Sequence, residues 1–271
     1  MSSETIDVVT VNQNTSEYTE LMLRSLFKRH ADLRGVSITV LDNNSDDNTP
    51  PLQEYLKSKQ IPLVKTQWAP IQAGNNHGEN LRDFTLSHPD ADYLLFLDPD
   101  IVFLQDETIT TMVSELRNAK DTWAVQARIS YDGKNEQQAG SREMGGQKKF
   151  QNIAFEDTYE EVQKGAPLRY SPLPAVMGGR IRPFCCLIKN TKALQLTALE
   201  IGFSCTHFEE SGCGKVYDIM GTATQVMKTH GLDFILSSKM IMHFGSVTYG
   251  NQSATKHERR QRLLAEIRLE G

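Results

Sequence analysis

The chain has 271 residues, of which 39% are hydrophobic and 23% charged, and its formal net charge is −5 at pH 7. A chain of this length and composition is compatible with one soluble globular domain that buries a large core. The acidic balance argues against a nucleic-acid-binding protein, because such proteins usually carry a basic excess.

The N-terminal stretch, MSSETIDVV, lacks the basic and apolar regions of a secretory signal peptide. No apolar run in the sequence approaches the ~20 residues that a helix needs to cross a bilayer. From these two features we expect a cytoplasmic protein.

The first half of the chain alternates between short apolar runs, typical of strands, and longer segments with helical periodicity. The expected strands cover residues 6–11, 36–41, 61–66, 92–97 and 122–131, and the expected helices cover 16–30, 51–59, 75–88 and 107–119. Ser16 is the expected N-cap of the first helix. This alternation predicts an α/β fold with a parallel sheet and helices on both faces.

Polar residues follow the ends of several expected strands. The first strand leads to Asn12 and Asn14, the second enters the turn LDNNSDDN, and the fourth enters DPD. Right-handed crossovers bring the carboxyl ends of parallel strands to one edge, where open α/β sheets bind ligands. We therefore expect these polar residues to gather at one binding edge.

The stretch LLFLDPDIVF places Asp98 and Asp100 at the end of the most apolar run in the chain. Residues two apart in an extended segment point to the same side, so the pair offers two oxygen ligands together. Such a pair suits Mg²⁺ or Mn²⁺. The alternative is a polar turn, and the position after the fourth strand favours the metal site. His243, in IMHFGS, is either a structural histidine or a further ligand.

The second half has a different character. Residues 132–182 are rich in glycine, glutamine and charge with weak periodicity, which is typical of a lid, a binding loop or disorder. Order resumes with an expected strand in 180–190 and a helix from Thr191 to Glu200. A helix over 217–231, further strand over 234–245 and a last helix over 254–270 complete the chain.

The four cysteines, Cys185, Cys186, Cys205 and Cys213, are expected to be free thiols in a reducing compartment. Cys205, His207 and Cys213 could supply three ligands to zinc, with Cys185 or Cys186 as a fourth. Their spacing matches no compact zinc pattern, so free thiols are the favoured interpretation.

Four segments, in order, resemble those of a glycosyltransferase of the GT-A fold, most closely glycosyltransferase family 2. VVTVNQN resembles the first nucleotide-binding strand, and ITVLDNNSDDN the turn whose leading Asp reads the base. AGNNHGEN resembles a segment that approaches the nucleotide, and YLLFLDPDIV resembles the metal-binding D-x-D. The resemblance implies a Rossmann-like, mostly parallel sheet with a C-terminal acceptor-side region.

The resemblance also implies roles for individual residues. The expected donor-nucleotide residues are Val11, Asn12, Asn14, Asp42, Asn44, Asn75, Asn76 and Asp98. The expected ligands of Mn²⁺ or Mg²⁺ are Asp98, Asp100 and His243, because MIMHFGSVTYG resembles the segment in which a His meets the metal or diphosphate.

The chain departs from the family pattern at two positions. Relatives often carry a Glu-Asp pair that opens a helix and supplies the catalytic base, whereas here Tyr217 precedes Asp218. Asp218 is the expected base, with Glu209 and Glu210 as alternatives. Asn75 stands where many relatives have an Arg near the diphosphate.

The function implied is transfer of a sugar from a nucleoside-diphosphate sugar to an acceptor hydroxyl on a glycan, a lipid-linked or a small molecule. Inversion is expected, and retention is the alternative. Asp42 favours a UDP- or dTDP-sugar, because a carboxylate can accept the ring N–H of uracil or thymine. Two other functions stay open: a sugar-phosphate nucleotidyltransferase, although VNQNTSEY lacks its Gly-rich basic loop, and a non-catalytic nucleotide-sugar binding protein.

We expect one GT-A domain with a nucleotide-sugar-binding half (1–131), an acceptor-binding and lid half (132–250) and a C-terminal amphipathic helix (251–271). That helix has an apolar stripe, Leu263, Leu264 and Ile267, and a set of basic residues, Arg259, Arg260, Arg262 and Arg268. It either packs on its own domain, forms a homodimer, or docks peripherally on the inner face of an anionic membrane.

Overall fold

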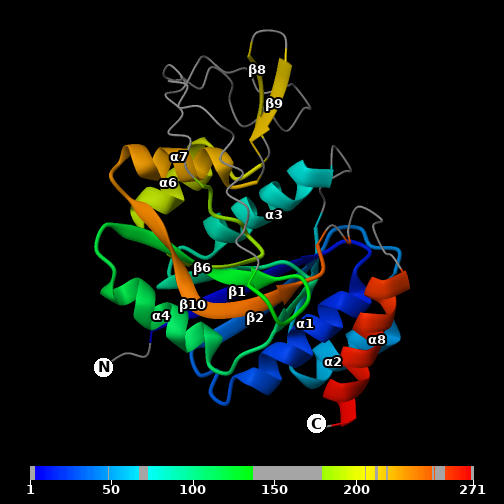
Figure 1. Ribbon diagram of the computed structural model, residues 1–271. Coiled ribbons are helices and arrows are strands. Elements are labelled where there is room, and N and C mark those ends of the chain that lie inside the picture. The colour runs from blue at the N-terminus through cyan, green and yellow to red at the C-terminus, as the bar shows by residue number, and fades with distance from the viewer. Residues whose placement is uncertain are drawn as a thin grey trace.

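The computed structural model describes residues 4–47, 49–66, 73–136, 179–204, 206–210, 213–217, 219–245, 247 and 254–269. Within these ranges, an eight-stranded sheet is flanked by helices, and a two-stranded sheet lies apart from it at the top of Figure 1. The predicted α/β class with helices on both faces of the sheet is confirmed.

The strands of the large sheet are β1 (Ile6–Asn12), β2 (Val36–Asp42), β3 (Leu63–Lys65), β4 (Tyr93–Leu97), β5 (Ile101–Phe103), β6 (Thr122–Ser130), β7 (Cys185–Lys189) and β10 (Asp233–His243). The helices are α1 (Ser16–Arg29), α2 (Pro50–Ser58), α3 (Ala73–Ser87), α4 (Thr108–Asn118), α6 (Lys192–Glu200), α7 (Gly221–Thr229) and α8 (Ala254–Leu269). The small sheet pairs β8 (Thr206–Glu210) with β9 (Cys213–Tyr217).

The order of strands in the large sheet is β3-β2-β1-β4-β7-β6-β10-β5. The neighbours β3, β2, β1 and β4 are parallel, as are β6 and β10. β7 runs antiparallel between β4 and β6, and β5 runs antiparallel to β10. The sheet is thus mostly parallel, and strands from the second half of the chain complete the sheet that the first half begins.

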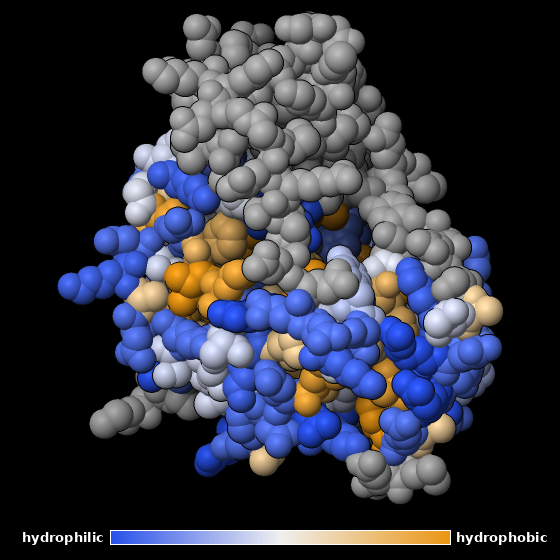
Figure 2. Space-filling model, viewed as in Figure 1, coloured by the Kyte–Doolittle hydropathy of each residue, from blue (hydrophilic) through white to orange (hydrophobic). Residues whose placement is uncertain are grey.

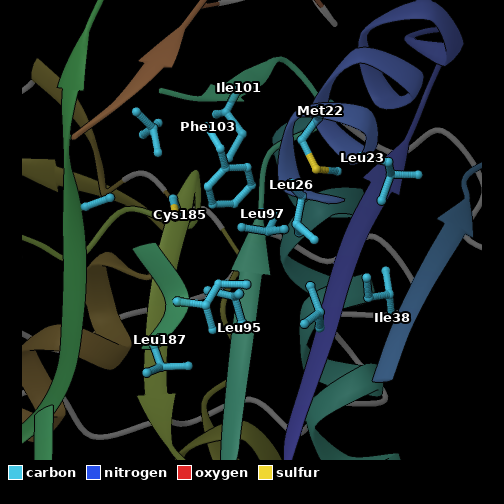
Figure 3. Packing of buried hydrophobic residues seen from close by; sticks show 14 of the residues in the cluster. Met22, Leu23, Leu26, Ile38, Leu95, Leu97, Ile101, Phe103, Cys185 and Leu187 are labelled. Atoms are coloured by element: carbon cyan, nitrogen blue, oxygen red, sulfur yellow. The ribbon is translucent and has the colours of Figure 1, made fainter. Parts of the chain in front are cut away.

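Two hydrophobic layers hold the helices to the sheet. α1, α2 and α4 pack on the lower face in Figure 1, and α3, α6 and α7 pack on the upper face. Figure 3 shows how side chains from α1, β4, β5 and β7 meet in the lower layer: Met22, Leu26, Leu95, Leu97, Phe103 and Cys185. Burial of these apolar side chains is the main source of stability for this arrangement.

The segment that reads as one apolar run, residues 94–103, is divided between two strands that are not neighbours in the sheet order. The chain leaves β4, an interior strand, at Leu97 and re-enters the sheet as the edge strand β5. Pro99 lies in the connection, where the lack of an N–H donor removes no ladder hydrogen bond. This crossing carries Asp98 and Asp100 between β4 and β10.

Two local predictions about helix starts are wrong. Thr15, not Ser16, is the N-cap of α1, and its side chain makes no capping bond. The Asp47 carboxylate caps the helix instead. It accepts hydrogen bonds from the backbone N–H of Ser16 at 3.0 Å and from the Ser16 hydroxyl at 2.9 Å. The helix expected over 217–231 begins only at Gly221, because Tyr217 ends β9.

The surface seen in Figure 2 is mostly hydrophilic, with hydrophobic side chains gathered over β10 and β6. Leu236 of β10 is the most exposed large hydrophobic residue among those described, at 49%. None of the helices in the described ranges combines the length and the apolar character needed to cross a bilayer.

Candidate active site

Three side chains from distant parts of the chain converge where β4 ends. Ligand atoms of Asp98, Asp100 and His243 all lie within 4.8 Å of one another. The Nε2 atom of His243 is 3.1 Å from Oδ1 of Asp100 and 3.6 Å from Oδ2 of Asp98. The predicted grouping of these three residues is therefore present in the structure.

The pairing of β5 with β10 brings His243 to the two aspartates. Ile101 and His243 are partners in this antiparallel ladder. Beyond the ladder, the N–H of Phe244 donates to the backbone oxygen of Asp100 at 3.0 Å, and the N–H of Val247 donates to the Asp100 carboxylate. On the other side, the N–H of Asp98 donates to the oxygen of Phe184 at 3.0 Å. Backbone bonds thus orient both carboxylates.

The electrostatics of the centre favour an ion pair when no cation is bound. Burial raises the pKa of the Asp100 carboxyl, but the charge and hydrogen bond of His243 outweigh burial and lower that pKa below its usual value. Burial likewise lowers the pKa of His243, and the two aspartates more than reverse this, so that its pKa is raised. A divalent cation bound here would compete with a proton for the His243 nitrogen.

The donor set fits a divalent cation of the Mg²⁺ and Mn²⁺ type. Two carboxylates supply hard oxygen ligands, and an imidazole nitrogen is a ligand that Mn²⁺ accepts more readily than Mg²⁺. Asp100 is only 5% exposed, and its Oδ1 lies 3.1 Å from the imidazole of His243. Two carboxylates held this close repel one another unless positive charge lies between them.

His77, near the start of α3, is a neighbour of this centre that the sequence reasoning missed. Its Nε2 lies 3.7 Å from Oδ1 of Asp98, so the Asp98 carboxylate is flanked by two imidazoles, with His243 facing the other oxygen. In the segment AGNNHGEN, the resemblance assigns roles only to Asn75 and Asn76. Only the packing of α3 on the sheet shows that the histidine faces Asp98.

Aromatic rings enclose His243. The Tyr131 ring stacks on the imidazole with centroids 6.1 Å apart, and the Phe184 ring lies 5.4 Å away. Tyr131 follows β6 and is 41% exposed, whereas Phe184 precedes β7 and is buried. The imidazole thus packs between a buried ring and one that is partly exposed to solvent.

The predicted nucleotide residues on β1 lie inside the protein. Asn12 is fully buried, and its amide donates to the hydroxyls of Ser16 and Ser45. The Asn12 oxygen accepts hydrogen bonds from the hydroxyls of Thr15 and Thr19. These contacts tie β1 to the start of α1. Val11 is 4% exposed and belongs to the upper hydrophobic layer.

The residues that end β2 are also largely internal. Asp42 is 2% exposed, and its Oδ1 accepts the N–H of Ser45 at 3.2 Å. Asn14 and Asn44 are exposed, and both have a φ of 54°, in the left-handed region that asparagine tolerates better than most residues. Asn14 accepts the N–H of Asp46 at 2.8 Å. The two loops after β1 and β2 therefore brace each other.

Asn76 differs from these satisfied amides. It is 1% exposed, and neither Nδ2 nor Oδ1 has a hydrogen-bond partner among the described residues. An unpaired buried amide is costly, so a bound water or ligand group is the expected partner. The side chain of the adjacent Asn75 lies outside the described residues.

The acceptor side is described only in part. Asp218, the expected base, lies outside the described residues, and so do the side chains of Glu209 and Glu210 on β8. The expected lid, 132–182, is described only at its two ends. The zinc hypothesis depended on Cys205, which also lies outside. Cys185 and Cys186 are free thiols buried in β7, and burial raises the pKa of both.

The loop that leads into the small sheet is locked to α3. A Cβ atom on Gly78 would lie 2.5 Å from the Cα of Ser204, so only glycine permits this approach. The Ser204 hydroxyl donates to the Glu79 carboxylate at 2.6 Å. Through these contacts the helix that carries Asn76 and His77 also supports the β8–β9 hairpin.

Comparison with protein families identifies the model for glycosyl transferase family 2, which matches residues 7–176. No curated protein sequence matches the chain. A mannosyltransferase from Pyrobaculum calidifontis, solved in complex with GDP-Man and Mn²⁺, superposes with a TM-score of 0.54 at 11% identity, covering 96% of this chain and 61% of its own.

Two further structures share the fold. Glucosyl-3-phosphoglycerate synthase from Mycobacterium tuberculosis, in complex with phosphoglyceric acid, has a TM-score of 0.52 at 14% identity, covering 98% of this chain and 79% of its own. S. aureus TarS has a TM-score of 0.51 at 14% identity, and the match covers 97% of this chain and 42% of TarS. At such identities the similarity concerns the fold, and this chain spans 42% of TarS and 61% of the mannosyltransferase.

Proposed function

This chain belongs to glycosyl transferase family 2, and on that premise we propose that it transfers a sugar from a nucleoside-diphosphate sugar to an acceptor hydroxyl at the centre formed by Asp98, Asp100 and His243. The convergence of two carboxylates and an imidazole within 4.8 Å at the end of a buried strand is the observation that carries this proposal. Family membership favours it over the nucleotidyltransferase alternative.

The three converging residues would hold Mn²⁺ or Mg²⁺. When bound, such a cation neutralises the charge that a nucleoside diphosphate gains as it leaves the sugar. Asp98 presents one oxygen toward His243 and the other toward His77, so its carboxylate can be shared between the cation and a neighbouring polar group. The Pyrobaculum calidifontis mannosyltransferase was solved with Mn²⁺, which supports testing this ion first.

We propose a UDP- or dTDP-sugar as the donor. The argument is chemical. Asp42 is the last residue of β2, at the edge of the sheet where β1, β2 and β4 end. Its carboxylate can accept a hydrogen bond from a pyrimidine ring N–H. The mannosyltransferase with the same fold was solved with GDP-Man. A guanine donor is therefore the alternative that the experiment must separate.

Asp218 is proposed as the base that takes the acceptor proton in an inverting reaction. It occupies the single position between Tyr217, which ends β9, and Ile219, which precedes α7. The N–H of Met220 is bonded to the oxygen of Phe203 at 2.9 Å, so the start of α7 is held to the loop that packs on α3. Glu209 and Glu210 on β8 are the alternative bases.

The test is calorimetry of UDP, dTDP and GDP with and without Mn²⁺, together with release of nucleoside diphosphate from candidate donors. We expect Mn²⁺ to tighten pyrimidine nucleotide binding by about 10-fold or more, because cation and diphosphate stabilise each other. Asp100→Asn should remove this enhancement. Asp106→Asn is the matched control, because its carboxylate follows β5 but is 73% exposed. Equal Mn²⁺ enhancement in all three proteins would refute the proposal.

A further inference from the structure

The C-terminal helix α8 lies beside α1 and close to the metal centre, as Figure 1 shows for the two helices. Its basic residues reach segments adjacent to metal ligands. Lys256 donates to the backbone oxygen of Gly245, two residues after His243. Arg259 donates to the backbone oxygen of Tyr131 at 2.6 Å, and the Tyr131 ring stacks on His243.

The next arginine, Arg260, contacts residues of α1 that pack beside His243. The Arg260 guanidinium lies 4.9 Å from the centroid of the Tyr18 ring and is ion-paired with Glu17. Tyr18 contacts the Phe244 ring edge-on at 5.0 Å. Arg260 is itself 3% exposed, so this contact is part of the protein interior.

A small hydrophobic cluster completes the connection. Its members come from α1, α8, β5, the end of β10 and the residues after it: Tyr18, Leu21, Val102, Met242, Phe244, Val247 and Leu264. Met242 and Phe244 flank His243 in the sequence, and the N–H of Val247 donates to the Asp100 carboxylate. Leu264 of α8 is 4% exposed and closes this cluster from outside.

The position of β5 explains why such a covering is needed. β5 has three residues and is the last strand in the sheet order, with β10 as its neighbour. A short edge strand is held by few ladder hydrogen bonds, and its outer side needs other elements to cover it. Asp100 precedes this strand, and His243 ends the strand paired with it, so both ligands depend on how firmly this edge is held.

The basic residues of α8 are engaged within the chain rather than displayed. Besides Arg259 and Arg260, Arg268 donates to the buried carboxylate of Glu20 at 2.7 Å. Arg262 is 69% exposed, and its pairing with Glu266 at 3.7 Å stays within the helix. Of the interpretations of this helix, packing on its own domain accounts for most of its charged side chains.

We propose that α8 is a positioning element for the metal centre, in which Lys256, Arg259 and Leu264 hold the segment from His243 to Val247 against β5. This inference rests on the proposed metal site. Groups that orient the ligands of a metal affect its affinity by about 10- to 100-fold when they are removed. The helix thus contributes to metal binding without supplying a ligand.

The experiment compares full-length variants by Mn²⁺ calorimetry in the presence of UDP. The double variant Lys256→Met and Arg259→Met removes both backbone contacts, and Leu264→Ala opens the cluster. Arg262→Met is the matched control on the same helix. We expect Mn²⁺ affinity to fall by about 10-fold in the first two proteins and to stay unchanged in the control. UDP affinity without metal should stay unchanged in all of them.

A rescue variant separates positioning from general loss of structure. Lys256→Arg with Arg259→Lys keeps both donors and should restore most of the Mn²⁺ affinity. Wild-type Mn²⁺ affinity in the double Met variant, or an equal loss of metal-free UDP binding, would overturn the inference, and the double variant decides the matter if Leu264→Ala does not fold. Absence of Mn²⁺ binding by the wild type would instead refute the metal site, and this inference with it.

Discussion

Two polar regions at the same edge of the sheet are built on opposite principles. Around Asn12, the loops after β1 and β2 satisfy their buried groups with one another, and the amide of Asn12 alone engages four hydroxyls. Around Asp98 and Asp100, two carboxylates lie close together against the imidazoles of His243 and His77. The first region satisfies its polar groups internally, whereas the second gathers groups that could hold a metal ion.

The difference shows how a buried polar residue can be interpreted. A buried amide with internal partners stabilises a loop, since leaving those partners unpaired is costly. Acidic side chains that lie close together, or a buried amide without partners, mark a place where a ligand can bind. By this criterion Asn12 is a structural residue, while the Asp98–Asp100 pair and the unpaired Asn76 are candidates for ligand contact.

Asp100→Asn is expected to have the largest effect on activity of the substitutions considered. If it reduced stability rather than turnover, the contrast between the two polar regions would not hold. Turnover should fall by about 10²- to 10³-fold, because charge stabilisation of the leaving group is lost. The circular dichroism spectrum and cooperative unfolding should be retained. Steady-state kinetics and thermal unfolding in the presence of a chelator check both statements. An Asp100→Asn protein with nearly normal turnover would contradict a role in charge stabilisation.

Asn12→Leu should have the opposite signature. It leaves the hydroxyls of Ser16, Ser45 and Thr19 without their common partner, so we expect a loss of about 2–4 kcal/mol in the free energy of unfolding. Urea denaturation measures this loss, with Asn118→Leu as an exposed control at the end of α4. In the fraction that stays folded, Mn²⁺ should enhance UDP binding as in the wild type. A change in that enhancement would show that the two regions are not separable.

Asp42→Ala tests whether the internal region also contributes to ligand binding. Nucleotide affinity should weaken by about 1–3 kcal/mol, the range for losing a hydrogen bond to a charged group. The loss should be the same with and without Mn²⁺, since Asp42 belongs to the edge formed by β1 and β2. Competition binding of UDP and GDP to the wild type and to the variant measures this loss of affinity. Equal affinity of the wild type for these two nucleotides would argue against base recognition by Asp42.

The smallest expected effect is a pH dependence of stability and of Mn²⁺ affinity that arises from His243. The aspartates raise the pKa of His243 in the folded protein above its ordinary value of 6.5. The ion pair therefore stabilises the metal-free protein fully below pH 6.5, and this stabilisation is lost as the pH rises through the folded pKa. Mn²⁺ affinity should change in the opposite sense and increase over that interval, because coordination requires neutral imidazole. His243→Gln should remove both dependences, as urea denaturation and calorimetry across pH would show.

Much of the fold could be predicted from local sequence. β1, β2, β4 and β6 are short, mostly apolar runs, and the intervening helices show apolar residues at helical spacing. Their order already implies a mostly parallel sheet. The D-x-D pair was identifiable for the same reason, since two carboxylates directly after a buried strand stand out against its periodicity. These features depend on residues close together in the chain.

Other features depended on contacts between distant segments. Ser16 looked like a cap, but Asp47 occupies that role from the loop after β2. The hairpin of β8 and β9 was hidden in a stretch that resembled a set of metal ligands. Asn12 looked like a residue of the binding edge, yet its side chain turns inward to the hydroxyls around it. A local pattern identifies which residues are polar but not which partners they meet.

By itself, then, the sequence determined the alternation of strands and helices and the presence of two carboxylates at a strand end, because both follow from side-chain periodicity within a few residues. Only the tertiary structure decided that β5 pairs with β10, which brings His243 to Asp100 from 143 positions away. It also decided that His77 faces Asp98 and that α8 packs beside α1, with Leu264 in the cluster next to His243. The physical reason is that periodicity specifies which face of an element is apolar, whereas its partner is selected by the burial and hydrogen bonding of the whole chain.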